Sequence, residues 1–238
     1  MKFTNEFMGG GSWLMFNRIS KTYDFLNGIL SFGIDRCWRK SLAESIYARP
    51  GLKILDVAAG TGDQLLENLK YLGACVERAV GVDPAEKMLA IACRKTVPRN
   101  TLVTPEWVLG WAEELPFEDN EFDVVSITFG IRNTMDPYKS LCEMRRVLKN
   151  GGSIRILEFS LPPFTFVREL YLLYFRRVLP WIGGRFSGDY FAYLYLNQSV
   201  ESFPQGDEFL EMLRGCGFVQ PRFRLLTMGI VTLYLAEK

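Results

Sequence analysis

The sequence predicts an α/β fold in which a mostly parallel sheet of seven strands is covered by helices on both faces. Two observations predict it: short apolar runs alternate with amphipathic segments, and the runs are almost continuously apolar, as strands buried on both faces are. A third observation, two apolar runs that meet at Gly229, predicts a C-terminal antiparallel hairpin. With 238 residues, 48% of them hydrophobic, the chain suits one domain spanning 1–238.

The first 50 residues precede the sheet. Residues 1–16 carry three glycines and a charged residue where a signal peptide would need an unbroken apolar core, so we expect a flexible leader. From Tyr23 to Ala48, aromatic, aliphatic and charged residues recur at helical spacing until Pro50 and Gly51 end the pattern. Residues 1–50 are therefore expected to contribute helices ahead of the sheet.

The central part of the chain carries the strand and helix alternation. Each strand-like run is followed by a segment with the composition and spacing of a helix. The expected strands are 53–57, 78–83, 106–112, 122–130 and 152–160, and the expected helices are 64–71, 84–94 and 136–148.

Residues 161–200 interrupt this alternation. Between Phe164 and Tyr195 the chain holds eleven aromatic residues interleaved with arginines, and no clean strand pattern. We expect an inserted helical cap whose aromatic residues pack its own core or receive an apolar ligand. After it, residues 206–218 predict a helix ended by glycine, and residues 222–238 form the hairpin.

Composition excludes several classes of function. The 28 basic and 27 acidic residues nearly cancel, which argues against a nucleic-acid-binding protein. The sequence has no histidine, and its five cysteines are scattered without a C-x-x-C pair, so neither a metal site nor a disulfide framework is expected. It has no run of 18 apolar residues, so we expect a cytoplasmic protein that at most lies on the inner face of the cell membrane.

The turn after the first strand is the principal motif. The stretch ILDVAAGTGDQLL passes from an apolar strand through small residues into a helix, an arrangement that lets a ligand approach the backbone. A nicotinamide dinucleotide would require G-x-G-x-x-G, but Gly60 and Gly62 are followed by Leu65 at the third position. A tight turn that needs glycine for its own geometry remains the structural alternative.

What remains is an acid at the end of the first strand (Asp56), the turn with Gly60 and Gly62, and a second acid at the end of the next strand (Asp83). This pattern resembles that of the Rossmann-like class I S-adenosylmethionine (SAM)-dependent methyltransferases. In that family the first-strand motif holds the methionine portion of SAM, an acid at the end of the second strand holds the ribose, and a residue pair after the third strand holds the adenine. Thr128 either lies against the cofactor or is an ordinary strand residue. The resemblance implies that SAM is bound by Asp56, Gly60, Thr61, Gly62, Asp83, Trp111, Ala112 and Thr128.

Two longer stretches resemble a narrower family, the C-methyltransferases of ubiquinone and menaquinone biosynthesis. They are KTYDFLNGILSFGIDRCWRK and SITFGIRNTMDPYKSLCEMRRVLKNGGSIRILEFS, and the likeness extends from about Tyr23 to Tyr234. It implies methylation of a ring carbon of a prenylated quinol, with demethylmenaquinol favoured over a benzoquinol. It also implies that the helices of residues 1–50 form a lid over the cofactor pocket.

The resemblance and the strand ends together nominate Tyr23, Asp24, Arg132 and Asn133 as catalytic residues. A ring hydroxyl must lose its proton before the neighbouring carbon can attack, and a guanidinium beyond the fourth strand can stabilise the phenolate. The alternatives are a surface ion pair for Arg132, a helix N-cap or turn for Asn133, and an ordinary capping arrangement for Tyr23 and Asp24. Asp35 stands where the family usually has histidine.

Expectations about partners follow from the proposed substrate. A prenylated quinol carries a long apolar tail, so we expect the aromatic cap to receive it and the protein to touch the membrane peripherally. A homodimer is compatible with the sequence, which does not decide it. Two rival functions remain, a SAM methyltransferase for another small or lipid-like acceptor, and a non-catalytic SAM-fold scaffold of a quinone-biosynthesis complex.

Overall fold

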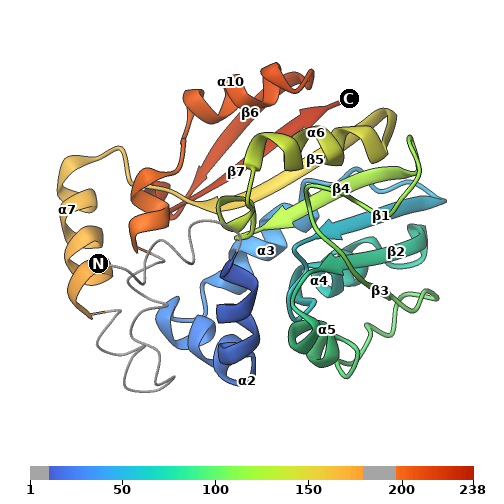
Figure 1. Ribbon diagram of the computed structural model, residues 1–238, viewed down its shortest axis with the longest axis horizontal. Coiled ribbons are helices and arrows are strands. Elements are labelled where there is room, and N and C mark those ends of the chain that lie inside the picture. The colour runs from blue at the N-terminus through green and yellow to red at the C-terminus, as the bar shows by residue number, and fades with distance from the viewer. Residues whose placement is uncertain (1–10, 179–196) are drawn as a thin grey trace.

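A computed structural model describes residues 11–178 and 197–238 and shows the predicted seven-stranded sheet (Figure 1). The strand order is β3-β2-β1-β4-β5-β7-β6. The pairings of β1 with β2 and β4, of β2 with β3 and of β4 with β5 are parallel, whereas β7 is antiparallel to both β5 and β6. The strands are β1 (Leu52–Val57), β2 (Val76–Asp83), β3 (Glu106–Leu109), β4 (Phe122–Thr128), β5 (Leu148–Phe159), β6 (Val219–Leu226) and β7 (Val231–Glu237).

The central strands are buried on both faces, which accounts for their continuous apolar runs. In β1 the side chain of Ile54 lies beside Ala79 of β2 on one side and Val124 of β4 on the other. All three are almost fully buried. Because parallel strands end at one edge of the sheet, the residues that follow β1, β2 and β4 meet there.

Helices cover both faces of the sheet and form two apolar cores. On one face, Leu141 of α6 and Phe209 of α10 pack against the sheet. On the other face, Leu42 of α3 and Leu65 of α4 do so. The helices are α2 (Ser12–Leu30), α3 (Asp35–Glu44), α4 (Asp63–Leu72), α5 (Glu86–Ala92), α6 (Pro137–Val147), α7 (Thr165–Leu173) and α10 (Asp207–Gly215), with shorter helical turns η2 (Gly73–Cys75), η3 (Ile131–Asn133), η4 (Tyr174–Val178) and η5 (Thr227–Gly229).

Three parts of the chain differ from, or only partly meet, the expectations. Helix α2 begins at Ser12, so the expected flexible leader was wrong for residues 12–16, which the lid helix includes because Met15 is buried beneath it. The third strand ends at Leu109, three residues early. In the predicted cap, α7, η4 and residues 197–202 are helical, and residues 179–196 lie outside the described residues.

Candidate active site

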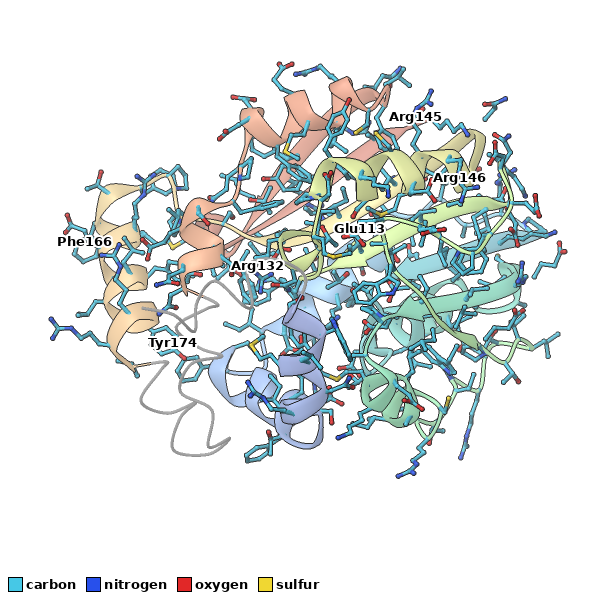
Figure 2. The ribbon with its side chains drawn as sticks, viewed as in Figure 1. Glu113, Arg132, Arg145, Arg146, Phe166 and Tyr174 are labelled. Carbon is cyan, nitrogen blue, oxygen red and sulfur yellow. The ribbon has the colours of Figure 1, made fainter. Side chains whose placement is uncertain are left out.

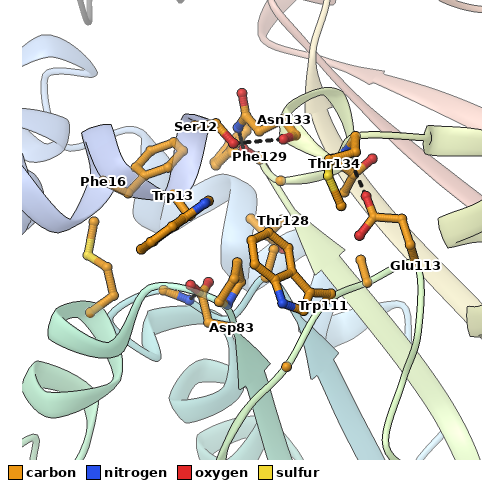
Figure 3. Close-up of a pocket in the computed structure, with 18 of the residues that line it drawn as sticks. Ser12, Trp13, Phe16, Asp83, Trp111, Glu113, Thr128, Phe129, Asn133 and Thr134 are labelled. Atoms are coloured by element: carbon orange, nitrogen blue, oxygen red, sulfur yellow. Dashed lines mark hydrogen bonds between the residues drawn. The ribbon is translucent and has the colours of Figure 1, made fainter. Parts of the chain in front are cut away.

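A pocket of about 720 Å³, including its open mouth, lies at the edge where β1, β2 and β4 end (Figure 3). Helix α2 covers it, contributing Ser12, Trp13, Phe16 and Tyr23 to its wall. Seven of the residues nominated from the sequence line this pocket, and five do not. Those that line it are Tyr23, Gly60, Asp83, Trp111, Ala112, Thr128 and Asn133, and those that do not are Asp24, Asp56, Thr61, Gly62 and Arg132.

The two glycines of the loop after β1 serve different purposes. Gly60 has φ of +55°, and a Cβ added to it would touch nothing within 4 Å, so its backbone faces open space. Gly62 has φ of +83°, and an added Cβ would lie 2.4 Å from the ring of Trp107. Gly60 therefore keeps a wall of the pocket clear, whereas Gly62 is required by packing and backbone conformation.

Asp83 ends β2 at the floor of the pocket. Its Oδ2 accepts a hydrogen bond from the Gly60 amide at 2.8 Å, and its Oδ1 accepts one from the Ala85 amide at 2.7 Å. Burial raises the pKa of this carboxyl to about 6, partly offset by those two hydrogen bonds. Each carboxylate oxygen retains lone-pair capacity, so Asp83 can still accept hydrogen bonds from a ligand.

Asp56 lies beneath the pocket. Its side chain is almost fully buried, and its Oδ1 accepts a hydrogen bond from the Ser126 hydroxyl at 2.7 Å. Burial raises the pKa of this carboxyl to about 7, and the Ser126 hydrogen bond and the charge of Arg39 oppose the rise. The observed partner ties β1 to β4, and direct contact of Asp56 with a cofactor stays a prediction.

Aromatic rings form the side of the pocket that follows β3. Trp111 of this segment meets Trp13 of α2 edge to face, with ring centroids 6.0 Å apart (Figure 3). Ala112 is buried beside Trp111, and the buried carboxylate of Glu113 accepts hydrogen bonds from the amides of Met135 (2.6 Å) and Asp136 (3.3 Å). The two indoles therefore contact each other directly and together form one aromatic wall of the pocket.

Asn133 lines the pocket, and its side chain holds a buried polar atom that is unpaired among the described residues. Its Nδ2 donates to the carbonyl oxygen of Phe129 at 3.1 Å, which orients the amide, and its Oδ1 is buried with no hydrogen bond. The helix that follows is capped by Asp136, whose Oδ1 accepts from the Lys139 amide at 2.9 Å. Asn133 is therefore not the N-cap of α6 but the last residue of the turn η3, and its side-chain oxygen is a buried acceptor whose capacity is unused.

Arg132 does not line the pocket, and its side chain is buried in the protein. Its guanidinium forms an ion pair with Glu158, and the two side chains are only 5% and 2% exposed. A second hydrogen bond runs from its Nη1 to the Phe129 carbonyl oxygen at 3.0 Å, and the guanidinium lies over the Phe159 ring. The ion pair expected as the alternative is therefore observed, but it is buried and does not lie at the surface. Direct catalysis by Arg132 stays a prediction.

Asp24 holds the lid to the glycine loop. Its Oδ1 accepts a hydrogen bond from the Thr61 hydroxyl at 2.6 Å, and its Oδ2 lies 2.7 Å from the Nζ of Lys95. Lys95 also pairs with Asp63 at the start of α4. Asp24 and Thr61 therefore meet each other rather than the pocket, and their predicted roles stay predictions.

Asp35, at the position where histidine was expected, is the first residue of α3. Its Oδ1 accepts a hydrogen bond from the Ser31 hydroxyl at 2.8 Å, and its other oxygen lies 4.0 Å from Arg39. Asp35 does not line the pocket. These contacts fix the turn before α3 and give Asp35 no access to a ligand in the pocket.

Twelve of the nineteen residues that line the pocket were missed by the sequence reasoning, among them Ser12, Trp13 and Glu113. Ser12 and Trp13 lie in the segment expected to be a leader, and the Ser12 hydroxyl donates to the carbonyl oxygen of Asn133 at 2.9 Å. Their helical continuity with the following residues was the available signal. Glu113, which follows the Trp111 and Ala112 pair directly, carried no separate pattern of its own.

The comparison with protein families identifies a close relationship. Residues 13–238 match the model described as the ubiE/COQ5 methyltransferase family. A Geotalea daltonii protein named ubiquinone/menaquinone biosynthesis C-methyltransferase UbiE is 43% identical over 224 residues, covering 94% of each chain. A Chlorobaculum tepidum protein named demethylmenaquinone methyltransferase is 42% identical over 228 residues, covering 94% of this chain and 90% of the relative.

Solved structures share the fold. A SAM-dependent methyltransferase from Thermotoga maritima, titled a possible histamine N-methyltransferase, has a TM-score of 0.63 at 19% identity, covering 95% of this chain and 99% of that one. A putative SAM-dependent methyltransferase from Methanococcus maripaludis has a TM-score of 0.65 at 18% identity, covering 92% and 91%. Within residues 11–178 and 197–238, no helix is both long and apolar enough to cross a membrane.

Proposed function

This chain belongs to the ubiE/COQ5 methyltransferase family, and from that premise we propose that it transfers a methyl group from SAM to a ring carbon of a prenylated quinol, with demethylmenaquinol as the preferred acceptor. The relatives named for quinone biosynthesis match nearly their whole length, and so support the reaction class. The single structural observation that supports it best is a pocket between α2 and the ends of β1, β2 and β4, with the Asp83 carboxylate on its floor and Asn133, whose buried amide oxygen is unpaired among the described residues, in its wall.

The residues present fit SAM. The clear space at Gly60 admits the methionine portion against the backbone. The remaining lone pairs of Asp83 suit the ribose hydroxyls, and the indoles of Trp13 and Trp111 suit the adenine ring. Bound there, SAM supplies an electrophilic methyl group carried on a sulfonium sulfur.

Asn133 is the residue we assign to the acceptor. Its Oδ1 accepts a hydrogen bond from a quinol hydroxyl, which places the adjacent ring carbon toward the cofactor side of the pocket. The carbonyl oxygen of Phe129 fixes the amide of Asn133 and is itself held by Arg132. Arg132 therefore acts as a positioning residue, because Glu158 already neutralises its charge.

The covering helix α2 contributes orientation and water exclusion. Phe16 and Tyr23 pack edge to face, with ring centroids 5.8 Å apart, and both line the pocket. An apolar wall of this kind excludes water from the reacting atoms, and it lies on the side from which an aromatic acceptor would enter. The sequence has no histidine, so the hydroxyl proton leaves to a carboxylate, a phenol or solvent.

The test is an assay of the purified protein with methyl-labelled SAM. Short-tailed demethylmenaquinol and benzoquinol analogues are offered in reduced and oxidised forms. We expect label only in the reduced quinones, with the naphthoquinol preferred, because only the quinol has a hydroxyl whose ionisation activates the ring carbon. An Asn133→Ala variant should lower kcat while leaving SAM affinity unchanged, and a Gln198→Ala variant outside the pocket serves as the control.

The result that would overturn the proposal is equally direct. If SAM binds but no quinol is labelled, the chain methylates another small or lipid-like acceptor or serves as a SAM-binding scaffold. Label in a phenol or amine, and none in a quinol, would identify the first case. We further propose that the acceptor reaches the pocket from a membrane; a homodimer stays a proposal to be tested by sedimentation.

A further inference from the structure

Helix α7 presents an apolar stripe to solvent. Phe166, Leu170 and Leu173 are spaced so that they share one helix face, and all three are exposed, Phe166 to 79%. Tyr171, on the opposite side of the helix, is buried. Figure 2 shows Phe166 on the side of α7 that is turned away from the sheet. The stripe is thus not part of either core of the domain.

Two turns outside α7 expose apolar side chains on an unfavourable backbone. Phe32 has φ of +53° and is 79% exposed, and Met228 has φ of +57° and is 63% exposed. A positive φ is uncommon for residues other than glycine and costs of order 1 kcal/mol or more. Neither residue gains compensating burial, so the exposed tips themselves are candidates for function.

The two tips lie beside α7. The ring of Phe32 lies 6.2 Å from that of Tyr174, directly after α7. The turn that carries Met228 abuts the start of the cap, since a Cβ added to Gly229 would lie 2.6 Å from Pro163. We call the six exposed residues gathered here the apolar rim: Phe32, Phe164, Phe166, Leu170, Leu173 and Met228.

Basic residues border the apolar rim. Arg168 of α7, Arg36 four residues after Phe32 and Arg177 four residues after Leu173 are exposed, and Arg176 pairs with Glu201 at 2.6 Å. Glu169 is the exposed acid within α7. The border therefore carries a net positive charge, which complements an anionic surface, and apolar tips flanked by arginine are typical of segments that lie in a membrane interface.

We propose that the apolar rim docks on the surface of an anionic lipid bilayer, with the phenyl rings and aliphatic side chains entering the boundary between headgroups and acyl chains. The inference deepens the proposed function and rests on it for the lipid-tailed acceptor. Each rim residue is more than half exposed and none of them lines the pocket described above, and protruding apolar side chains of this kind suit entry into a bilayer. Docking would bring the lid side of the pocket close to the membrane that holds the acceptor.

The test is cosedimentation of the full chain with vesicles of phosphatidylcholine containing 30% phosphatidylglycerol, and with pure phosphatidylcholine. The double variant Phe166→Ser with Leu170→Ser should lower the partition coefficient into vesicles at least about tenfold, because two apolar side chains that would enter the bilayer are lost. The matched control is Leu102→Ser with Val219→Ser, two exposed apolar residues elsewhere on the chain, and it should bind as the unaltered protein does.

Further outcomes separate the docking surface from the reaction. Equal vesicle binding by both double variants, or binding that does not depend on the anionic lipid, would overturn the docking proposal while leaving the methylation of short-tailed quinols intact. A variant that loses vesicle binding but methylates a soluble short-tailed quinol normally would support it. A shift from dimer to monomer in sedimentation, without a change in vesicle binding, would instead make the rim a contact between two copies.

Discussion

The two sides of the pocket that we propose for the cofactor and for the acceptor are built in different ways. On the cofactor side, Gly60 and Asp83 sit at the ends of neighbouring parallel strands, and a hydrogen bond of 2.8 Å joins them directly. On the acceptor side, Asn133 depends on the Phe129 carbonyl, and α2 covers it from a distant part of the sequence. The first arrangement follows from sheet topology, whereas the second depends on contacts between segments more than 100 residues apart.

The largest change in stability is expected at the buried ion pair of Arg132 and Glu158, behind the proposed acceptor side. Replacing Arg132 by Met leaves the Glu158 carboxylate buried without a counter-charge, which should lower the free energy of unfolding by about 3–5 kcal/mol. Pairing Arg132→Met with Glu158→Leu should restore most of that loss. Urea unfolding monitored by circular dichroism measures both.

These two variants also test what Arg132 does for turnover. If Arg132→Met folds with unchanged stability and still loses activity, the guanidinium acts on the substrate directly and the positioning role is wrong. If the double variant recovers stability but not activity, the hydrogen bond from Arg132 to the Phe129 carbonyl is what orders Asn133.

On the cofactor side, Asp83→Ala should weaken SAM binding about 10- to 100-fold, because hydrogen bonds to a charged acceptor contribute about 1.5–3 kcal/mol. Titration calorimetry measures this, and Glu86→Ala, an exposed acid at the start of α5, is the control. An affinity for SAM within about twofold of the unaltered protein would show that the ribose does not meet Asp83.

The buried acid beneath the pocket should make stability depend on pH. Burial raises the pKa of Asp56 to about 7, above its ordinary value of 3.8, so between these values the folded protein holds a proton that the unfolded chain has lost. The unfolding free energy therefore falls as pH rises through this range. Relative to Asp56→Asn, the Tm of the SAM-free protein should drop by roughly several degrees from pH 5 to pH 8.

The pH experiment has an internal control. Asp83, whose pKa burial also raises, is present in both proteins, so its contribution cancels in the difference apart from its charge interaction with Asp56. As a control, Asp207→Asn replaces an exposed acid at the start of α10. The difference in Tm between this variant and the unaltered protein should stay constant from pH 5 to pH 8. A parallel course of Tm for the unaltered protein and Asp56→Asn would mean that Asp56 titrates as an exposed carboxyl does.

The smallest effect is expected where the lid meets the glycine loop. Lys95→Met removes the partner of Asp24 from a half-exposed ion pair, so its contribution to stability should be below about 1 kcal/mol. SAM dissociation should nevertheless accelerate a few-fold in stopped-flow fluorescence, because α2 is held over the pocket less tightly. Lys70→Met, which removes the exposed pair with Glu67, is the control. Equal SAM dissociation rates in the two variants would show that the Lys95–Asp24 ion pair does not hold α2 over the pocket.

The sheet and the cofactor side could be predicted from the sequence because both depend on local pattern. Apolar runs of strand length, a glycine turn after the first run and an acid at the end of the second were sufficient to place Gly60 and Asp83 together. The extent of α2 was missed, because glycines at 9–11 favour a flexible leader and only the burial of Met15 beneath the lid continues the helix. Local propensity was overruled there by packing.

The sequence by itself determined the fold class and the place of the glycine turn at the ends of the parallel strands, because periodicity and short motifs act over a few residues, and its longer motifs determined the family. Tertiary structure alone decided that Arg132 turns inward to Glu158, that Asp24 joins Thr61 and Lys95, and that Phe32 and Met228 stand beside α7. Which way a side chain turns depends on charges and surfaces supplied by distant segments, and these meet only when the chain has folded.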